Sequence, residues 1–263
     1  MALNKEIWVS DIQELLLPDN SFVTKGTDYS AFADAHTVHI PVEAGNVNVE
    51  IDRSVLPGTV GVSNDAEQAI IMHHFTTDPV RCFRPEDVEL SYDKRSVLTK
   101  KIADSLNGKI AEYALGILGQ IGGGTVASNA KVLEKLRAAA LAFDKGDYPE
   151  ADRYVLLSAD TYSKLLKELT DAQTNAFLQV ANAATGVIGG IYGLNILKRS
   201  SVGENIDYIA WHKRDYMFAL GDTEVYTQEN APEYYGTILS ASARFGAYVP
   251  ASEPAQGGEG GNG

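Results

Sequence analysis

The clearest periodic pattern in the chain predicts one long amphipathic helix over residues 86–118. Apolar residues recur there at three- and four-residue steps, the spacing that places them on one face of a helix. Most of the charged residues of this stretch lie off the apolar stripe, and Asp93 is a suitable N-cap. The stripe consists of Val97, Leu98, Ile102, Leu106, Ile110, Ala114 and Leu118.

A second pattern runs from Asp152 to Ser200 and predicts a strand, a capped helix and a glycine-rich hairpin, in that order. Residues 153–157 read Arg-Tyr-Val-Leu-Leu, which favours a strand. Ser158 is a suitable N-cap for the following helix, and Asp160 lies in its first turn, where the helix dipole favours a carboxylate. Further on, apolar residues alternate with glycines, which predicts two strands joined by tight turns. These glycines are Gly186, Gly189, Gly190 and Gly193.

The remaining apolar patterns predict several strands and one more helix. Period-two alternation, typical of half-buried strands, marks residues 37–42, 47–52 and 238–245. Further strands are expected over residues 69–77, 208–212 and 216–220, and a helix over residues 131–143. This mixture predicts an α+β fold. A chain of 263 residues can bury a substantial core, in one large domain or two smaller ones.

The two ends of the chain differ in character. Residues 1–35 contain Trp8 and the run Leu15, Leu16 and Leu17, which Pro18 ends. Such a short amphipathic segment cannot bury its apolar side chains alone, so it packs either on its own core or on a neighbouring subunit. Residues 251–263 consist mainly of Gly, Glu, Asn, Pro and Ser, and we expect them to be disordered.

Charge and cysteine content narrow the class of protein. The 22 basic and 35 acidic residues give a net charge of −13, which argues against a general nucleic-acid binder because such proteins need a basic face. Cys82 is the only cysteine, so no disulfide can form within the chain, and this fits a reducing cytoplasm. Residues 172–197 carry no charge, but their amide side chains and glycines favour a helix or loop followed by a hairpin over a membrane span.

No residue pattern predicts a catalytic, metal or cofactor site. His73 and His74 are adjacent on an expected strand and therefore point to opposite faces, so they cannot chelate one metal as a pair. Residues 119–125 are glycine-rich, but they follow a helix and lack the Lys-Ser/Thr ending of a phosphate-binding loop, so we interpret them as a flexible connection. No Gly-x-Ser-x-Gly motif surrounds Ser158, which leaves it a helix cap and not a nucleophile.

The order and spacing of these segments resemble the axial-domain signature of tailed-phage major capsid proteins, which have the Hong Kong 97 fold. The resemblance is carried by residues 153–166 and 186–200, and residues 243–250 (Ala-Arg-Phe-Gly-Ala-Tyr-Val-Pro) resemble the last peripheral-domain strand of that family. It implies the following organisation: an N-terminal arm over residues 1–35, a peripheral-domain strand and extended β-loop over 36–85, a peripheral domain with a spine helix over 86–143, an axial domain over 144–225, a C-terminal return strand over 226–250, and a disordered tail over 251–263.

The resemblance implies a structural virion protein, not an enzyme, which self-assembles into pentamers and hexamers of an icosahedral head enclosing double-stranded DNA. Expected partners are other copies of the chain, a separate scaffolding protein, a portal and decoration proteins, with packaged DNA in the shell lumen, no sequence-specific binding of that DNA, and no membrane. Assembly is expected in the cytoplasm of the host bacterium. The expected inter-subunit contacts are Trp8, Leu15, Leu16 and Leu17 in the arm and Gly186, Gly189, Gly190 and Gly193 in the axial hairpin.

Two alternatives stay open. The first is an encapsulin-type bacterial compartment, which uses the same fold around a protein cargo. The second is a soluble α+β enzyme, which the missing acid–base or metal set makes the less favoured alternative.

Overall fold

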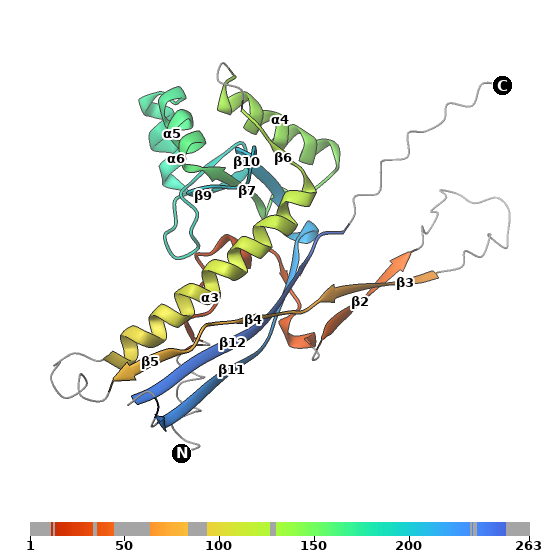
Figure 1. The fold of residues 1–263 in the computed structure, drawn as a ribbon. Helices are drawn as coiled ribbons and strands as arrows, with labels where there is room; N and C mark the ends of the chain where they lie inside the picture. The colour runs from red at the N-terminus through yellow and green to blue at the C-terminus, as the bar shows by residue number, and fades with distance from the viewer. Residues whose placement is uncertain are drawn as a thin grey trace.

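The computed structural model has two lobes, an elongated lobe built around a long helix and a compact lobe built around a five-stranded sheet (Figure 1). It describes residues 12, 14–33, 36–44, 64–83, 94–126, 130–231, 233 and 236–250. The elongated lobe comprises the described residues up to 121 and from 216 onward, and the compact lobe comprises those from 123 to 215. This mixture of helices and sheets confirms the α+β class.

Helix α3 (Lys94–Leu118) is the long amphipathic helix that the sequence predicts. The stripe is buried from Ile102 to Leu118, whereas Val97 is 53% exposed, so the buried face begins at the half-buried Leu98. The first residues of the predicted helix, 86–93 with the expected cap Asp93, lie outside the described residues.

The sheet of the elongated lobe packs against α3 and has the strand order β1–β11–β12–β4, with β5 also paired to β12. Its strands are β1 (Thr27–Asp28), β4 (His73–Thr76), β5 (Val80–Phe83), β11 (Met217–Ala231) and β12 (Gly236–Tyr248). The strands predicted over 216–220 and 238–245 are confirmed, and both are longer than predicted. Leu239, Ala241, Ala243 and Phe245 of β12 are all buried, as the alternation predicts.

A second hairpin, of β2 (Thr37–Ala44) and β3 (Asn64–Ile71), projects from the elongated lobe (Figure 1). It confirms the strand predicted over 37–42, whereas the strand predicted over 47–52 lies outside the described residues. The base of the hairpin lies so close to β12 that a Cβ atom on Gly246 would come within 2.7 Å of the Ile70 side chain and of the Ile71 carbonyl oxygen. Glycine at this position therefore sets how closely the hairpin approaches the sheet.

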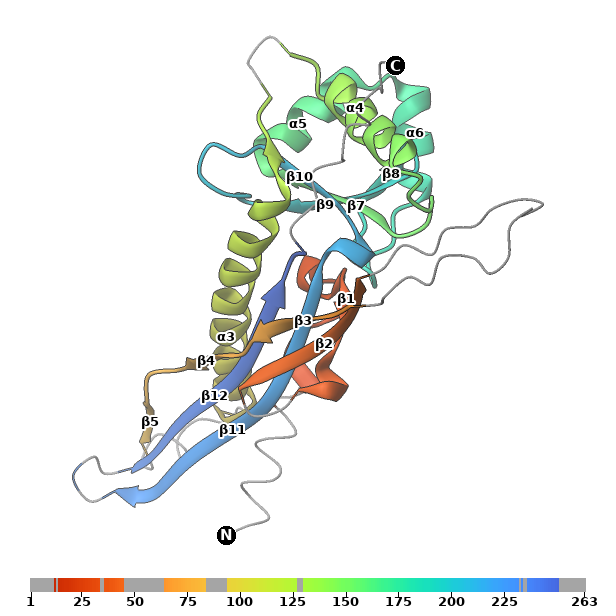
Figure 2. The same cartoon turned by 90° about the vertical axis from the view of Figure 1, so that its right-hand side faces the viewer.

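The compact lobe contains a sheet with the order β6–β10–β7–β9–β8 (Figure 2). Its strands are β6 (Gly123–Gly124), β7 (Arg153–Ser158), β8 (Gly189–Ile191), β9 (Leu194–Arg199) and β10 (Tyr208–His212). Helices α4 (Val132–Lys145), α5 (Ala159–Glu168) and α6 (Asp171–Gln179) cover one face. Val155 and Leu157 face these helices, whereas Leu156 faces the core shared with the elongated lobe. Burial on both faces explains the unbroken apolar run of β7.

Polar groups at the helix ends hold the layer of helices together. The Ser158 hydroxyl accepts a hydrogen bond from the Thr161 N–H at 3.2 Å, which confirms the predicted cap of α5. Helix α4 has no cap from its own side chains; the Glu168 carboxylate, at the end of α5, accepts hydrogen bonds from the Val132 and Leu133 N–H groups at 2.9 and 3.0 Å. Glu168 thus joins two helices that are far apart in the sequence.

Residues 119–125 are not the flexible connection that we predicted. They form a 3₁₀ turn, η3 (Gly119–Ile121), and then β6, which pairs with β10. The glycines allow this pairing, because a Cβ atom on Gly124 would lie 2.3 Å from the Tyr208 ring and one on Gly123 would lie 2.4 Å from Ile206. The segment is therefore an edge strand of the compact lobe.

The packing units differ from the predicted domain ranges at two boundaries. Helix α4, placed in the peripheral range 86–143, packs with α5 and β7 in the compact lobe, because its apolar face covers the same side of the sheet. Strand β11 crosses the predicted boundary at 225, because its pairing with β12 already begins at Met217. The axial and peripheral domain names remain predictions from the resemblance.

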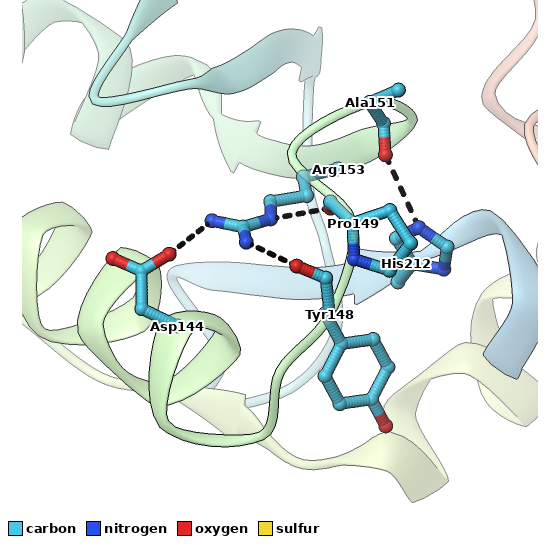
Figure 3. Close-up of polar contacts among 6 residues, drawn as sticks. All are labelled: Asp144, Tyr148, Pro149, Ala151, Arg153 and His212. Carbon is cyan, nitrogen blue, oxygen red and sulfur yellow. Dashed lines mark hydrogen bonds and ion pairs between the residues drawn. The ribbon is translucent and has the colours of Figure 1, made fainter.

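A buried arginine fixes the loop that connects α4 to β7 (Figure 3). Arg153 is 3% exposed; its guanidinium donates to the Asp144 carboxylate at 2.7 Å and to the carbonyls of Pro149 and Tyr148 at 2.8 and 2.6 Å. Beside it, His212 Nδ1 accepts the Arg214 N–H at 3.1 Å, so the ring proton lies on Nε2 and is donated to the Ala151 carbonyl. The loop is thereby tied to η4 (Lys213–Asp215), where the chain leaves the compact lobe.

None of the helices in the described part of the chain combines the length and the apolar character that a membrane crossing requires.

The Arg153 contacts give a first prediction. Arg153→Met keeps much of the apolar stem but leaves two carbonyls without a donor, so we expect a loss of about 2–4 kcal/mol in the free energy of unfolding. Urea unfolding followed by circular dichroism measures it. Asp144→Asn is the control, because that side chain is 59% exposed and its change should cost less than about 1 kcal/mol. Equal losses in the two variants would show that the carbonyl contacts are not the stabilising ones.

Candidate assembly surfaces

The glycine-rich hairpin of the compact lobe is formed as predicted. Strands β8 and β9 pair up to Ile191 and Leu194, which leaves Tyr192 and Gly193 as a two-residue turn. Their φ values are 52° and 73°, and positive φ at both positions is the pattern of a type I′ turn. A Cβ atom on Gly193 would meet no other atom within 4 Å, so this glycine serves the backbone conformation and not the packing.

The other three glycines serve close contacts within the chain. A Cβ atom on Gly189 would lie 2.3 Å from the Phe177 ring, and one on Gly190 would lie 3.0 Å from Val180. Gly186 has a φ of 73°, and a Cβ atom there would lie 2.2 Å from the Asn20 carbonyl oxygen. Gly189 and Gly190 therefore shape the hairpin for its own lobe, and Gly186 allows it to approach the N-terminal segment at Asn20. Contact of these glycines with another subunit stays a prediction.

Exposed apolar side chains stand beside this hairpin. Leu178 and Val180, at the end of α6, are 47% and 51% exposed, and Tyr192 in the turn is 49% exposed. We name these three residues the apolar tip. Single exposed apolar residues are normal, but several on adjoining elements indicate a contact surface. The sequence pattern missed Leu178 and Val180; their signal was that they lie off the buried side of α6, which Phe177 occupies.

The three arm leucines have different environments. Leu16 is buried in the chain's own core, where Ile12 is buried too, so for this part of the arm the intramolecular alternative holds. Asn107 of α3 fixes the segment, since its side-chain amide accepts the Leu17 N–H at 3.0 Å and donates to the Leu15 carbonyl at 2.8 Å. The Leu15 side chain is 40% exposed and remains available for a neighbour. Trp8 lies outside the described residues.

Residues 20–28, which we name the N-terminal strap, contact both lobes. The indole N–H of Trp211 in the compact lobe donates to the Lys25 carbonyl at 2.9 Å. In the elongated lobe, β1 pairs in parallel with Met217 and Phe218. Burial lowers the pKa of the Lys25 ammonium, and its Nζ donates to the Asp19 carbonyl at 2.6 Å. The strap therefore belongs to the subunit's own framework.

A second set of contacts to the compact lobe lies beside the strap. The Arg199 guanidinium, at the end of β9, donates to the Ala111 carbonyl of α3 at 3.2 Å and stacks 5.2 Å from the centre of the Phe22 ring. Burial lowers the pKa of Arg199, and the nearby Glu112 carboxylate opposes this shift. Arg199 thus joins β9 to both α3 and the strap.

The described residues contain no group of three or more His, Cys, Asp or Glu side chains placed to hold a metal ion. His73 and His74 are both exposed on β4, with the His73 ring 4.9 Å from the Tyr113 ring. Burial raises the pKa of several tyrosines, that of Tyr154 to about 12, which keeps these phenols neutral.

No family model and no curated protein matches the chain, but solved structures do. The capsid of the cyanophage P-SCSP1u aligns with a TM-score of 0.62 at 16% identity, covering 86% of this chain and 83% of that chain. The capsid of an empty GTA particle aligns with a TM-score of 0.64 at 13% identity, covering 89% and 87%. A structure of Mycobacterium phage Che8 aligns with a TM-score of 0.61 at 14% identity, covering 90% and 86%.

The chain has the fold of phage capsid proteins. This capsid fold extends over both lobes, since each alignment covers more than four fifths of each chain. The resemblance inferred from residues 153–166 and 186–200 is thereby confirmed. At these identities the likeness concerns the fold, and contacts between subunits have to be argued from this chain's own residues.

The hairpin glycines give a second prediction. Gly189→Ala forces a methyl group against the Phe177 ring and should cost about 1–3 kcal/mol, whereas Gly193→Ala meets only backbone strain and should cost about 1 kcal/mol. Urea unfolding measures both. In the double variant Gly189→Ala/Phe177→Leu the smaller side chain relieves the clash, so the losses should be less than additive. Additive losses would contradict the close approach.

Proposed function

We propose that this chain is the major capsid protein of a tailed bacteriophage, a structural subunit that assembles into the pentamers and hexamers of an icosahedral head enclosing double-stranded DNA. The observation that supports this most is the likeness to phage capsid structures over nearly the whole length of both chains.

The mechanism of such a subunit is geometric. The β2–β3 hairpin projects from the body (Figure 1) and would reach a neighbouring subunit, together with residues at the N-terminus. Helix α3 stiffens the elongated lobe, and the compact lobes would meet at their apolar tips around local five-fold and six-fold axes. Contacts between two different surfaces of identical subunits close into rings, and rings of two sizes close a shell.

Charge sets the conditions of assembly. Each subunit carries a net charge of −13, so copies repel one another at low ionic strength, and salt should favour assembly by screening this repulsion. The same charge keeps the subunit from binding DNA phosphates without sequence specificity, as suits a container. A separate scaffolding protein, a portal and decoration proteins complete the proposed set of partners, with assembly in the host cytoplasm.

Assembly of the chain alone is the direct test. Electron microscopy and analytical ultracentrifugation at several salt concentrations should show shells, sheets or rings, with more of them as salt rises. Hydrogen exchange of the unassembled chain should show weaker protection in β2 and β3 than in β7, because the hairpin has little core of its own. A chain that stays monomeric at every salt concentration and protects β2 as strongly as β7 would refute the proposal.

The apolar tip gives a third prediction. Val180→Asp and Tyr192→Asp place charge on a surface that assembly would bury, so the assembled mass at a given protein concentration should fall at least tenfold. The thermal unfolding midpoint of each variant should stay within a few degrees of the wild type, because both side chains are half exposed in the subunit. Leu141→Asp is the matched control, since this residue of α4 is 52% exposed and lies outside the apolar tip. Equal assembly of the tip variants and the wild type would show that the tip is not a contact.

A further inference from the structure

A groove of about 470 Å³ opens between α3 and strands β4 and β5. We name it the α3–β4 groove. Its apolar lining includes Phe75 and Val80 from the strand side and Leu98 and Ile102 from the helix side. Val80 is 37% exposed and Leu98 is half-buried, so apolar surface remains open in the subunit itself.

The groove adjoins β4, which is an edge strand among the described residues. Within the described residues β4 pairs with β12 alone, and β12 occupies one side of it. The N–H and C=O groups along its other side therefore have no strand partner there. Such an edge accepts an extended segment through main-chain hydrogen bonds, with alternate side chains entering the adjoining groove.

Two lysines line the helix side of the groove, although the chain as a whole is acidic. They are Lys101 and Lys109 of α3. Lys109 donates to the exposed Glu112 carboxylate at 2.8 Å, while Lys101 forms no ion pair with a described residue. Asp78, the acidic residue of the lining, belongs to the segment between β4 and β5.

We propose that the α3–β4 groove binds an extended segment of a separate protein in which apolar and acidic residues alternate. The apolar side chains would cover Val80, Phe75 and Leu98, the carboxylates would pair with Lys101 and Lys109, and the backbone would pair with the free edge of β4. Charge complementarity selects the partner, because a basic or neutral segment gains nothing from the two lysines. The binding needs only the folded subunit and does not depend on shell formation.

Synthetic peptides test this on the full chain, at a concentration where ultracentrifugation shows it unassembled. The probes are a fluorescein-labelled peptide of ten residues that alternates valine with glutamate, and its counterpart with lysine in place of glutamate. Fluorescence anisotropy should show saturable binding of the acidic peptide to the wild type. The double variant Lys101→Glu/Lys109→Glu should bind this peptide at least tenfold more weakly. The lysine peptide should bind the double variant more tightly than it binds the wild type. Leu98→Ser should also weaken the binding of the acidic peptide, because it removes an apolar side chain from the lining of the groove.

The control variant carries Lys164→Glu with Lys167→Glu, two exposed lysines of α5, and should bind the acidic peptide as the wild type does. The proposal would be overturned if the acidic peptide showed no saturable binding. It would also be overturned if the two double variants weakened the binding equally. Acetylation of Lys101 before and after assembly gives a further test. If assembly without peptide blocks this acetylation, the occupant of the groove is a second copy of the chain, and the proposal is overturned. A chain that stays monomeric at every salt concentration and protects β2 as strongly as β7 would refute the proposed function and leave this result unaffected.

Discussion

The structure depends on the burial of one face of α3 in a core that both lobes share. Ile102, Leu106 and Ile110 pack into the same cluster as Phe245 of the elongated sheet, and Leu118 belongs to this cluster together with Trp211 of the compact lobe. Apolar area removed from water is the largest favourable contribution to folding, and here one helix contributes it to two sheets. Substituting a residue of this stripe would therefore loosen both lobes at once.

Local features of this fold could be predicted from the sequence because neighbouring residues encode them. The α3 stripe, the Ser158 cap and the Tyr192–Gly193 turn all follow from residues within a few positions of one another. Each feature depends on a short-range effect: the helix on its apolar periodicity, the cap on a hydroxyl that accepts a backbone N–H, and the turn on a glycine that adopts positive φ.

The features that could not be predicted join residues far apart in the chain. Glu168 caps a helix that begins 36 residues earlier. Gly124 lies in a segment that the sequence predicts to be a flexible connection, but in the fold it packs closely against Tyr208. The packing partner of the arm could not be predicted for another reason. The hydrophobicity of Leu16 indicates that its side chain is buried, but it does not indicate whether the burial is in its own subunit or in a neighbouring one. The alternation of side chains along a strand likewise cannot reveal that β4 has only one strand neighbour among the described residues, because this depends on the order of strands in the finished sheet.

The N-terminal strap has a mechanical consequence. The backbone passes from one lobe to the other at only two places in the described chain, near residue 122 and near residue 216, and two such crossings would leave a hinge. The strap adds a third attachment at a different position, through Lys25 to Trp211 on one side and through Thr27 to Met217 on the other. Together with the Arg199 contact to Ala111 of α3, these attachments should restrain the angle between the lobes. In any repeating arrangement of copies that angle would contribute to the curvature, so contacts inside one subunit would help to set the size of the particle.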